Sequence, residues 1–187
     1  MLTAIRTRLR GDHGVTLLEV LIAMVVTLVV GAAIVSALSQ STRAAQRNHN
    51  RTTALAQMQT AAQRIARELR AADPITVAQS DLAEATIVRS GQTRTYRYRL
   101  VASGTEYQVE EVRTAGGVAT TFVLARGFAA AGMVIQYYDG AGVELVPPVT
   151  GGNLPLIQTI KLTLTRFIPL SSQPITLETT VDVRNQA

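Results

Sequence analysis

The sequence predicts an α+β fold, in which one long N-terminal helix precedes an antiparallel β-sheet. No proline interrupts residues 15–72, so one helix can run through that whole segment. Between Leu55 and Leu69 the apolar residues repeat every three or four positions, which is the period of one helix face. After Pro74, short runs alternate apolar and polar residues between glycine and proline turns, as in a sheet with one buried face.

The chain divides into four predicted segments. Residues 1–14 are a short basic leader, and residues 15–38 are an apolar helix. Residues 39–73 continue that helix as an amphipathic segment, and residues 74–187 form the antiparallel β domain. The apolar stripe of the amphipathic segment is expected to pack on the sheet, because a helix must bury its apolar face against another element.

The apolar helix is long enough to cross a membrane. Residues 15–38 include fourteen Leu, Ile or Val among 24 residues, and a bilayer core is about 30 Å thick. Together these side chains favour insertion by about 4–8 kcal/mol, whereas one acid at the centre costs about 2.5–3.5 kcal/mol. Glu19 lies near the end, so insertion tolerates it without explaining its presence. The predicted anchor residues are Leu17, Leu18, Val20, Leu21, Ile22, Val25, Val26, Leu28, Val29 and Val30.

Two ordinary explanations of this segment are incomplete. A secretory signal has a shorter apolar run, followed by a small-residue cleavage site that this chain lacks. A plain signal anchor fits the length and the hydropathy, but it leaves Glu19 without a role. Charge does not fix the orientation of such an anchor, because three arginines flank each end: Arg6, Arg8 and Arg10 before it, and Arg43, Arg47 and Arg51 after it.

The composition excludes several classes of site. There are no cysteines, which excludes disulfides, thiolate metal sites and a cysteine nucleophile. The histidines, His13 and His49, both precede the β domain, so a histidine-based active site is excluded there. Without residues 1–14, fifteen basic and twelve acidic side chains remain, which is a weak argument for nucleic-acid binding. No phosphate-binding loop, dinucleotide fingerprint or nucleophile elbow is present. We therefore expect a protein that is not an enzyme and has no cofactor or metal.

The charged residues of the amphipathic segment are expected to face water. Opposite the apolar stripe the helix carries Arg64, Arg67, Glu68 and Arg70. The dipeptide Asp73-Pro74 is expected to end the helix, because the residue before a proline resists the α conformation. Polar residues 46–53 could fray or bend it.

Alternation predicts the strands of the β domain and the faces of their side chains. On residues 94–101, Tyr96 and Tyr98 should face the core, and the arginines Arg94, Arg97 and Arg99 should face water rather than nucleic acid. The predicted strands are 84–89, 94–101, 106–113, 119–125, 133–138, 157–167 and 175–183.

Two groups of acids in the β domain have structural explanations. Asp139 and Glu144, in YYDGAGVE, supply too few oxygens for a calcium loop, so a turn is expected. The adjacent Glu110 and Glu111 should point to opposite faces of a strand, so they cannot act as a catalytic carboxylate pair.

The N-terminal residues carry a family resemblance. A basic leader ending in Gly14, then VTLLEV and an apolar run, resembles the prepilin signal of type IV pilins and of the pseudopilins of type II secretion. The resemblance implies a pilin-like fold, cleavage after Gly14 by an aspartyl prepilin peptidase, and N-methylation of the new first residue, Val15. It also implies anchoring in the bacterial inner membrane, with the leader in the cytoplasm and the C-terminal domain in the periplasm.

The same resemblance implies a role for Glu19. In an assembled filament its carboxylate would face the free amino group of Val15 on a neighbouring subunit. An unpaired charge in a dry helix bundle is costly, so this pair would favour the register in which the charges meet. The chain departs from the family at Val15, where phenylalanine is usual, and at Ser36, where many major pilins have proline. The second departure suggests a minor subunit.

Three later motifs narrow the resemblance. QMQTAAQRIARELRAAD, YYDGAG and the terminal TTVDVRN are similar to segments of J-type minor pseudopilins and W-type minor pilins. The implied partners are the prepilin peptidase, other minor subunits and the inner-membrane assembly platform, with nucleic acid only if the filament takes up DNA. A type II secretion pseudopilus and a type IV pilus both stay open. The rival from another class is a signal-anchored periplasmic binding or sensor protein that never assembles.

Overall fold

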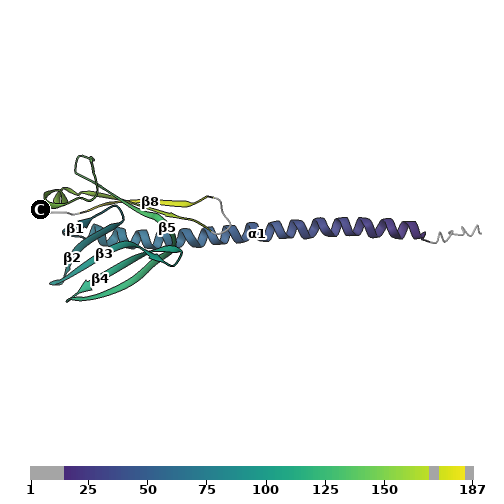
Figure 1. Ribbon diagram of the computed structural model, residues 1–187, viewed down its shortest axis with the longest axis horizontal. Coiled ribbons are helices and arrows are strands. Elements are labelled where there is room, and N and C mark those ends of the chain that lie inside the picture. The colour runs from purple at the N-terminus through teal and green to yellow at the C-terminus, as the bar shows by residue number, and fades with distance from the viewer. Residues whose placement is uncertain (1–14, 169–172, 184–187) are drawn as a thin grey trace, which may run out of the picture. The chain divides into compact units, whose positions relative to one another are not determined.

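The computed structural model describes residues 15–168 and 173–183 (Figure 1). The predicted leader, its cleavage residue Gly14 and residues 184–185 of the terminal motif lie outside the described residues. The chain divides into two compact units, residues 1–45 and 46–187, and each is considered by itself. The described part is α+β, because helix α1 (Leu17–Arg70) precedes an antiparallel sheet, as the sequence predicts.

Helix α1 begins and ends at signals that the sequence supplies. At its start, the backbone N–H of Glu19 donates to the Thr16 hydroxyl oxygen at 3.2 Å, which is an N-cap contact. After its end, the N–H of Asp73, the residue before the proline, donates to the carbonyl of Thr86 at 2.8 Å. Residues 46–53 neither fray nor bend out of the helix, which runs through them unbroken.

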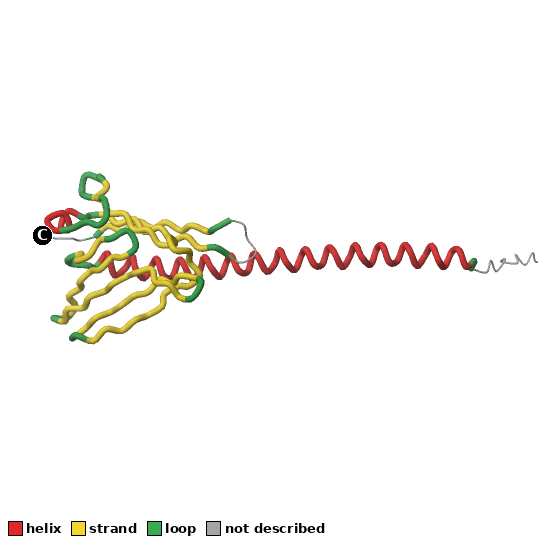
Figure 2. The backbone as a smooth tube through the Cα atoms, in the orientation of Figure 1, coloured by secondary structure: helices red, strands yellow, loops and turns green. Residues whose placement is uncertain are grey.

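The β domain is one eight-stranded antiparallel sheet (yellow in Figure 2). Its strands lie in the order β1-β2-β3-β4-β5-β7-β8, and β6 pairs with β5 off this path. The strands are β1 Ile75–Ala78, β2 Leu82–Arg89, β3 Gln92–Ser103, β4 Glu106–Ala115, β5 Val118–Tyr138, β6 Glu144–Leu145, β7 Thr159–Arg166 and β8 Ile175–Asp182, with the 3-10 helix η1 Gly151–Leu156 between β6 and β7.

Strand β5 joins two predicted strands, 119–125 and 133–138, into one of 21 residues. It pairs with β4 over its first half and with β7 from Phe128 onward. The change of partner occurs beside Gly127, whose φ of +83° favours glycine and whose added Cβ would lie 2.9 Å from the Nε of Arg166. Register shifts on both sides of this glycine interrupt the alternation, so the sequence shows two short strands where the fold has one.

Three elements are absent from the sequence prediction: strand β1, the two-residue strand β6 and helix η1. Strand β1 has four residues, which are too few to show alternation. Helix η1 contains Pro155 and begins with two glycines, a composition typical of a loop.

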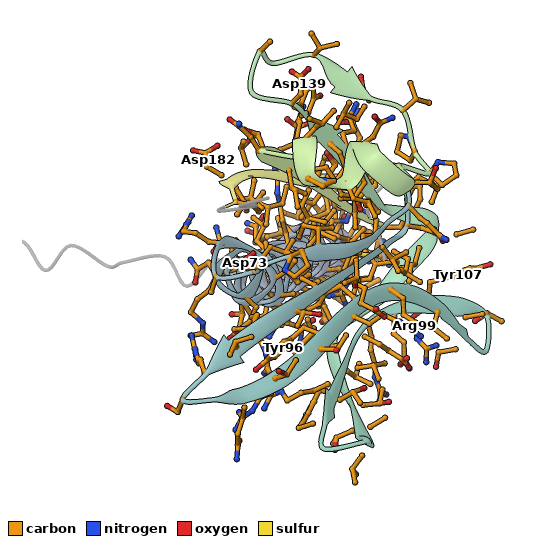
Figure 3. The ribbon with its side chains drawn as sticks, turned by 90° about the vertical axis from the view of Figure 1, so that its left-hand side faces the viewer. Asp73, Tyr96, Arg99, Tyr107, Asp139 and Asp182 are labelled. Atoms are coloured by element: carbon orange, nitrogen blue, oxygen red, sulfur yellow. The ribbon has the colours of Figure 1, made fainter. Side chains whose placement is uncertain are left out.

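The second unit has one hydrophobic core, which forms where the sheet curls around the C-terminal part of α1 (Figure 3). The helix contributes Met58, Ile65 and Leu69, as its apolar stripe predicts. Every buried hydrophobic residue of the described chain lies between Ala54 and Val183, so the core is complete without the first unit. The largest buried side chains of the β domain are Tyr98, Met133, Ile135, Tyr137, Ile157, Ile160, Leu162 and Leu164.

The prediction that the charged residues at the C-terminal end of the helix face water is partly wrong. Arg67 and Arg70 are exposed, but Glu68 is buried and Arg64 is half-buried. Glu68 lies three residues after the buried Ile65, which places both side chains on the same side of the helix. The sheet curls far enough to cover this part of the helix as well.

The faces of β3 follow the prediction at four of five positions. Tyr96 and Tyr98 are buried, whereas Arg97 and Arg99 reach outward to carboxylates on neighbouring strands. Arg94 is a correction, because it lies on the inner face of the strand and is half-buried there. Its position differs by an even number from those of the tyrosines, so it lies on their face of the strand.

Candidate assembly site

The apolar part of α1 has no cover within the described chain. Every residue from Val15 to His49 is exposed, including all ten predicted anchor residues, and Leu17 and Leu28 are 86% and 73% exposed. By length and composition this helix can cross a membrane, with a mean hydropathy of 2.7 over its most apolar stretch. A helix that is apolar on all sides needs lipid or other helices around it.

Two hydroxyl groups on this segment donate to backbone carbonyls within the helix. The Thr27 hydroxyl donates to the carbonyl of Ala23 at 2.8 Å, and the Ser39 hydroxyl donates to the carbonyl of Val35 at 2.8 Å. Such back-bonding removes most of the desolvation penalty of a hydroxyl in an apolar environment. Thr27 and Ser39 are therefore compatible with lipid or with a dry helix bundle.

Glu19 differs from those hydroxyls, because no described residue neutralises its charge. It is the first charged residue of α1, and the next one is Arg43. None of the ion pairs among the described residues includes its carboxylate. It lies on one side of the helix, in a shallow hollow that is otherwise lined by Val15, Val20, Ala23, Met24, Thr27 and Leu28. A helix that packed into this hollow would enclose the carboxylate.

The first turn also gives Glu19 a local role. Thr16 and Glu19 have the spacing of a capping box, and their N-cap contact is present at 3.2 Å. An acid in the first turn also interacts favourably with the helix dipole. Sequence reasoning missed this role, although the T-x-x-E spacing is visible in VTLLEV. The local role needs only a side chain that suits a helix start, whereas the predicted assembly role needs the negative charge.

In the second unit, a buried ion cluster joins the helix to the sheet. We call Arg64, Glu111 and Arg113 the helix–sheet clamp. Arg64 donates from Nε and Nη2 to the two carboxylate oxygens of Glu111, at 2.8 and 3.0 Å, and Arg113 donates to the same carboxylate at 2.9 Å. The Glu111 side chain is fully buried. Both guanidinium groups also lie over the ring of Phe122, 5.5 and 5.1 Å from its centre.

Strand register places the clamp. Glu111 of β4 lies opposite Tyr98 of β3 on one side and Phe122 of β5 on the other. Its neighbour Glu110 points to the opposite face and binds Arg99 at 3.0 Å, so the two acids do not form a pair, as predicted. Sequence reasoning missed the clamp, because the pattern between Val109 and Arg113 predicts that an acid there lies at a solvent-exposed position of a strand. The only signal was Arg64 on the helix, which needed a buried partner.

Burial raises the pKa of two core tyrosines well above the ordinary range. The pKa of Tyr98 is raised by desolvation first and by the nearby carboxylates of Glu111 and Glu68 second. The pKa of Tyr137 is raised by desolvation first and by Asp81 second. The two hydroxyls differ in bonding, because Tyr137 donates to the carbonyl of Gln79 at 3.0 Å, whereas the Tyr98 hydroxyl has no hydrogen-bond partner in the described part of the chain.

These tyrosines predict an alkaline loss of stability. The folded state holds both phenolic protons above pH 10, where the unfolded chain releases them. Stability is therefore fully present below pH 10 and falls by about 1.4 kcal/mol per pH unit for each tyrosine as the pH rises. Urea unfolding of a fragment of residues 46–187, which contains the whole core, measures this slope.

Two phenylalanine variants provide the matched control. Above pH 10, Tyr98→Phe and Tyr137→Phe should each reduce the fall of the unfolding free energy with pH by the contribution of one tyrosine, about 1.4 kcal/mol per pH unit. At pH 7 the first should be nearly neutral, because it removes an unpaired hydroxyl, and the second should lose about 1 kcal/mol with its hydrogen bond. A slope that is unchanged in both variants would contradict the assignment.

The YYDGAGVE segment forms a turn, as predicted, and both of its acids accept hydrogen bonds within the chain. The Asp139 carboxylate accepts hydrogen bonds from the backbone N–H groups of Ala141 and Val143, at 2.9 and 2.8 Å, and so closes the turn. Glu144 accepts from the side chain of Gln136 instead. Among the described residues, no group of three or more acids and histidines could hold a metal ion.

Comparison with known proteins identifies a class for the N-terminal segment. Residues 9–35 match the family model of the prokaryotic N-terminal methylation motif, which supports membership of the type IV pilin and pseudopilin superfamily. The matched range includes Gly14, Val15 and Glu19, and it supports a pilin-like substrate of prepilin peptidase. No curated protein matches the chain. The similarity to J-type and W-type minor subunits therefore stays a prediction.

Proposed function

We propose that this chain is a minor pilin or pseudopilin subunit, which is cleaved after Gly14 and then built into a short filament or its tip. In this proposal residues 1–14 are the leader, residues 15–38 are the membrane and assembly helix, residues 39–73 are its amphipathic continuation, and residues 74–187 are the periplasmic β domain. Its partners are the prepilin peptidase, other minor subunits and the inner-membrane assembly platform.

One observation carries the proposal: a wholly exposed apolar helix, within the match to the N-terminal methylation motif, has a single acid in its first turn that no described residue pairs. Before assembly, lipid covers the apolar side chains and Glu19 lies at the membrane boundary. After assembly, neighbouring helices cover the same side chains, and Glu19 enters the bundle. A buried carboxylate without a partner is strongly unfavourable, so it needs a cation there.

Cleavage supplies that cation. Peptide-bond cleavage after Gly14 would create an ammonium group on Val15, and N-methylation keeps its charge. The three arginines of the leader, which hold residues 1–14 at the cytoplasmic face, would be removed in the same step. Proteolysis would thus create one partner of the charge pair and release the helix for packing. This couples processing to assembly by electrostatics alone.

The mass of the N-terminal peptide tests the proposal against its rival. We expect the full chain, recovered from membranes of cells that contain a prepilin peptidase, to begin at N-methylated Val15. As the control, Gly14→Leu should leave the chain inserted but uncut, because the bulky side chain blocks the cleavage site. A wild-type chain that begins at Met1, or at a cut elsewhere, would instead support a signal-anchored binding or sensor protein.

Two machines fit the proposal. A type II secretion pseudopilus would use the subunit near exported proteins, and a type IV pilus would use it to begin fibre growth, adhere or take up DNA. DNA binding by the full chain at physiological salt would favour the DNA-uptake pilus, and its absence would leave secretion, adhesion and initiation.

A further inference from the structure

The first half of β5 is a free strand edge. Strand β4 pairs with it on one side, whereas β7 pairs with β5 only from Phe128 onward, so no described strand covers the other side of residues 118–126. Residues 118–125, VATTFVLA, contain no charge, glycine or proline, and Val118 and Val123 are 69% and 41% exposed. Natural sheets usually protect such an edge with charges, proline or a covering element. An unprotected edge of this length indicates a partner strand.

The sheet has a second long free edge at β8, its last strand. The outer face of β8 is polar, because Thr176, Glu178, Thr180 and Asp182 alternate with inward-facing residues. At the other end of the strand order, β1 is only four residues long, and Val149 bridges it at Ala78. The first half of β5 and strand β8 are therefore two long edges where a strand could be added.

These two edges carry complementary charges. Arg126 ends the free part of β5, is exposed, and has no ion-pair partner among the described residues. Asp182 ends β8, is exposed, and accepts only a hydrogen bond from the Thr159 hydroxyl at 3.0 Å (Figure 3). Each charge lies at the C-terminal end of its edge, so a parallel pairing of the two edges would bring them together.

Strand direction favours the same arrangement. Strand β7 is antiparallel to both β5 and β8, so β5 and β8 run in the same direction within one copy. A neighbour in the same orientation would therefore present β8 parallel to β5. An antiparallel pairing of β5 with itself would reverse α1 in the second copy, because the helix lies against the sheet. In the proposed filament neighbouring copies share one orientation, so this antiparallel pairing is not expected there.

We propose that the free edge of β5 in one copy binds β8 of a second copy in parallel register, with Arg126 beside Asp182. With Arg126 beside Asp182, counting back along both strands places Val123 beside Thr180. The count differs by one because the register shift between Val123 and Ala125 adds one residue to β5. Both side chains are on the outer faces of their strands, opposite to Phe122 and Val181. The contact is head to tail, so it leaves a free edge at each end and can repeat along a filament. Only the common orientation of the copies rests on the proposed function.

Cysteine cross-linking of the full chain in membranes tests the contact, and the natural absence of cysteine leaves no background. One copy carries Val123→Cys, and a second copy with a different tag carries Thr180→Cys. We expect mild oxidation to give a disulfide-linked dimer that carries both tags, and no dimer from either copy alone. The pair Val123→Cys and Thr176→Cys should not link, because four residues displace the sulfurs by about 13 Å along the strand.

A charge exchange provides the second readout. In the first copy, Arg126→Asp should lower the cross-linked fraction roughly two- to fivefold, the effect of one exposed ion pair. In the second copy, Asp182→Arg should restore it. Dimers from Val123→Cys alone, or no mixed dimer from well-expressed copies, would overturn the proposal. If the chains still begin at methylated Val15 and still assemble, such a failure refutes this contact and leaves the proposed function intact.

Discussion

Replacing Glu19 by alanine is expected to abolish assembly while leaving insertion and cleavage intact. The acid is not needed for insertion, because the fourteen Leu, Ile and Val residues of the segment drive it. The cleavage residues Gly14 and Val15 are unchanged. In a helix bundle, however, the ammonium group of Val15 would lose its counter-charge, and an unpaired buried charge is strongly unfavourable. The measurement is the fraction of mature chain that sediments with filaments.

Two conservative variants separate the assembly role of Glu19 from its local role. Glu19→Gln keeps the side-chain shape and suits the capping box with Thr16, but it has no charge. Glu19→Asp keeps the charge on a shorter side chain. We expect Gln to fail almost as completely as alanine, and Asp to retain part of the assembly. Normal incorporation of the Gln variant would show that assembly does not need the charge of Glu19.

The second large effect is expected at the helix–sheet clamp. Glu111→Ala would leave two arginines of the clamp without their shared carboxylate, at a site where the acid is fully buried. Breaking a buried ion pair by removing one partner costs about 3–5 kcal/mol. Because the side chains of Arg64 and Arg113 keep 33% and 32% exposure, some of that penalty is screened. We expect a loss near the lower limit, roughly 3 kcal/mol, in urea unfolding of residues 46–187.

A surface pair and an apolar replacement are the controls for the clamp. Glu178→Ala removes an exposed carboxylate, 3.0 Å from Lys161, and should leave the unfolding midpoint unchanged within error. Replacing the pair together, as Arg64→Met with Glu111→Leu, should lose less stability than Glu111→Ala alone, because no helix charge stays buried without a partner. Equal losses for Glu178→Ala and Glu111→Ala would contradict a special role for the clamp.

The sequence predicts the helix and the long strands well, because those elements depend on local pattern. The apolar stripe from Leu55 to Leu69 and the alternation around Tyr96 and Tyr98 each depend on nearby residues, and both are confirmed. The exposed apolar helix follows in the same way from composition. The site residues Val15 and Glu19 could be named because their motif is contiguous and can be recognised without a fold.

Long-range features could not be predicted. Whether Glu68 faces water depends on how far the sheet curves around the helix. No local sequence pattern indicates the curvature of a sheet. The clamp joins residues 47 positions apart, Arg64 and Glu111, so only strand register reveals it. The free edge of β5 appears only once Gly127 is known to divide the pairing between β4 and β7. Sequence gives the faces of each strand, but it does not give the neighbour of each strand.

The geometry of the charge pair in an assembled filament tests the central claim most directly. In a filament structure that contains this chain, we expect the amino nitrogen of Val15 to lie within about 4 Å of the Glu19 carboxylate of a neighbouring subunit. That result would show a pair between molecules, with one partner created by cleavage. A Val15 amino group bound to Glu19 of its own chain, or a filament whose subunits keep residues 1–14, would contradict the account.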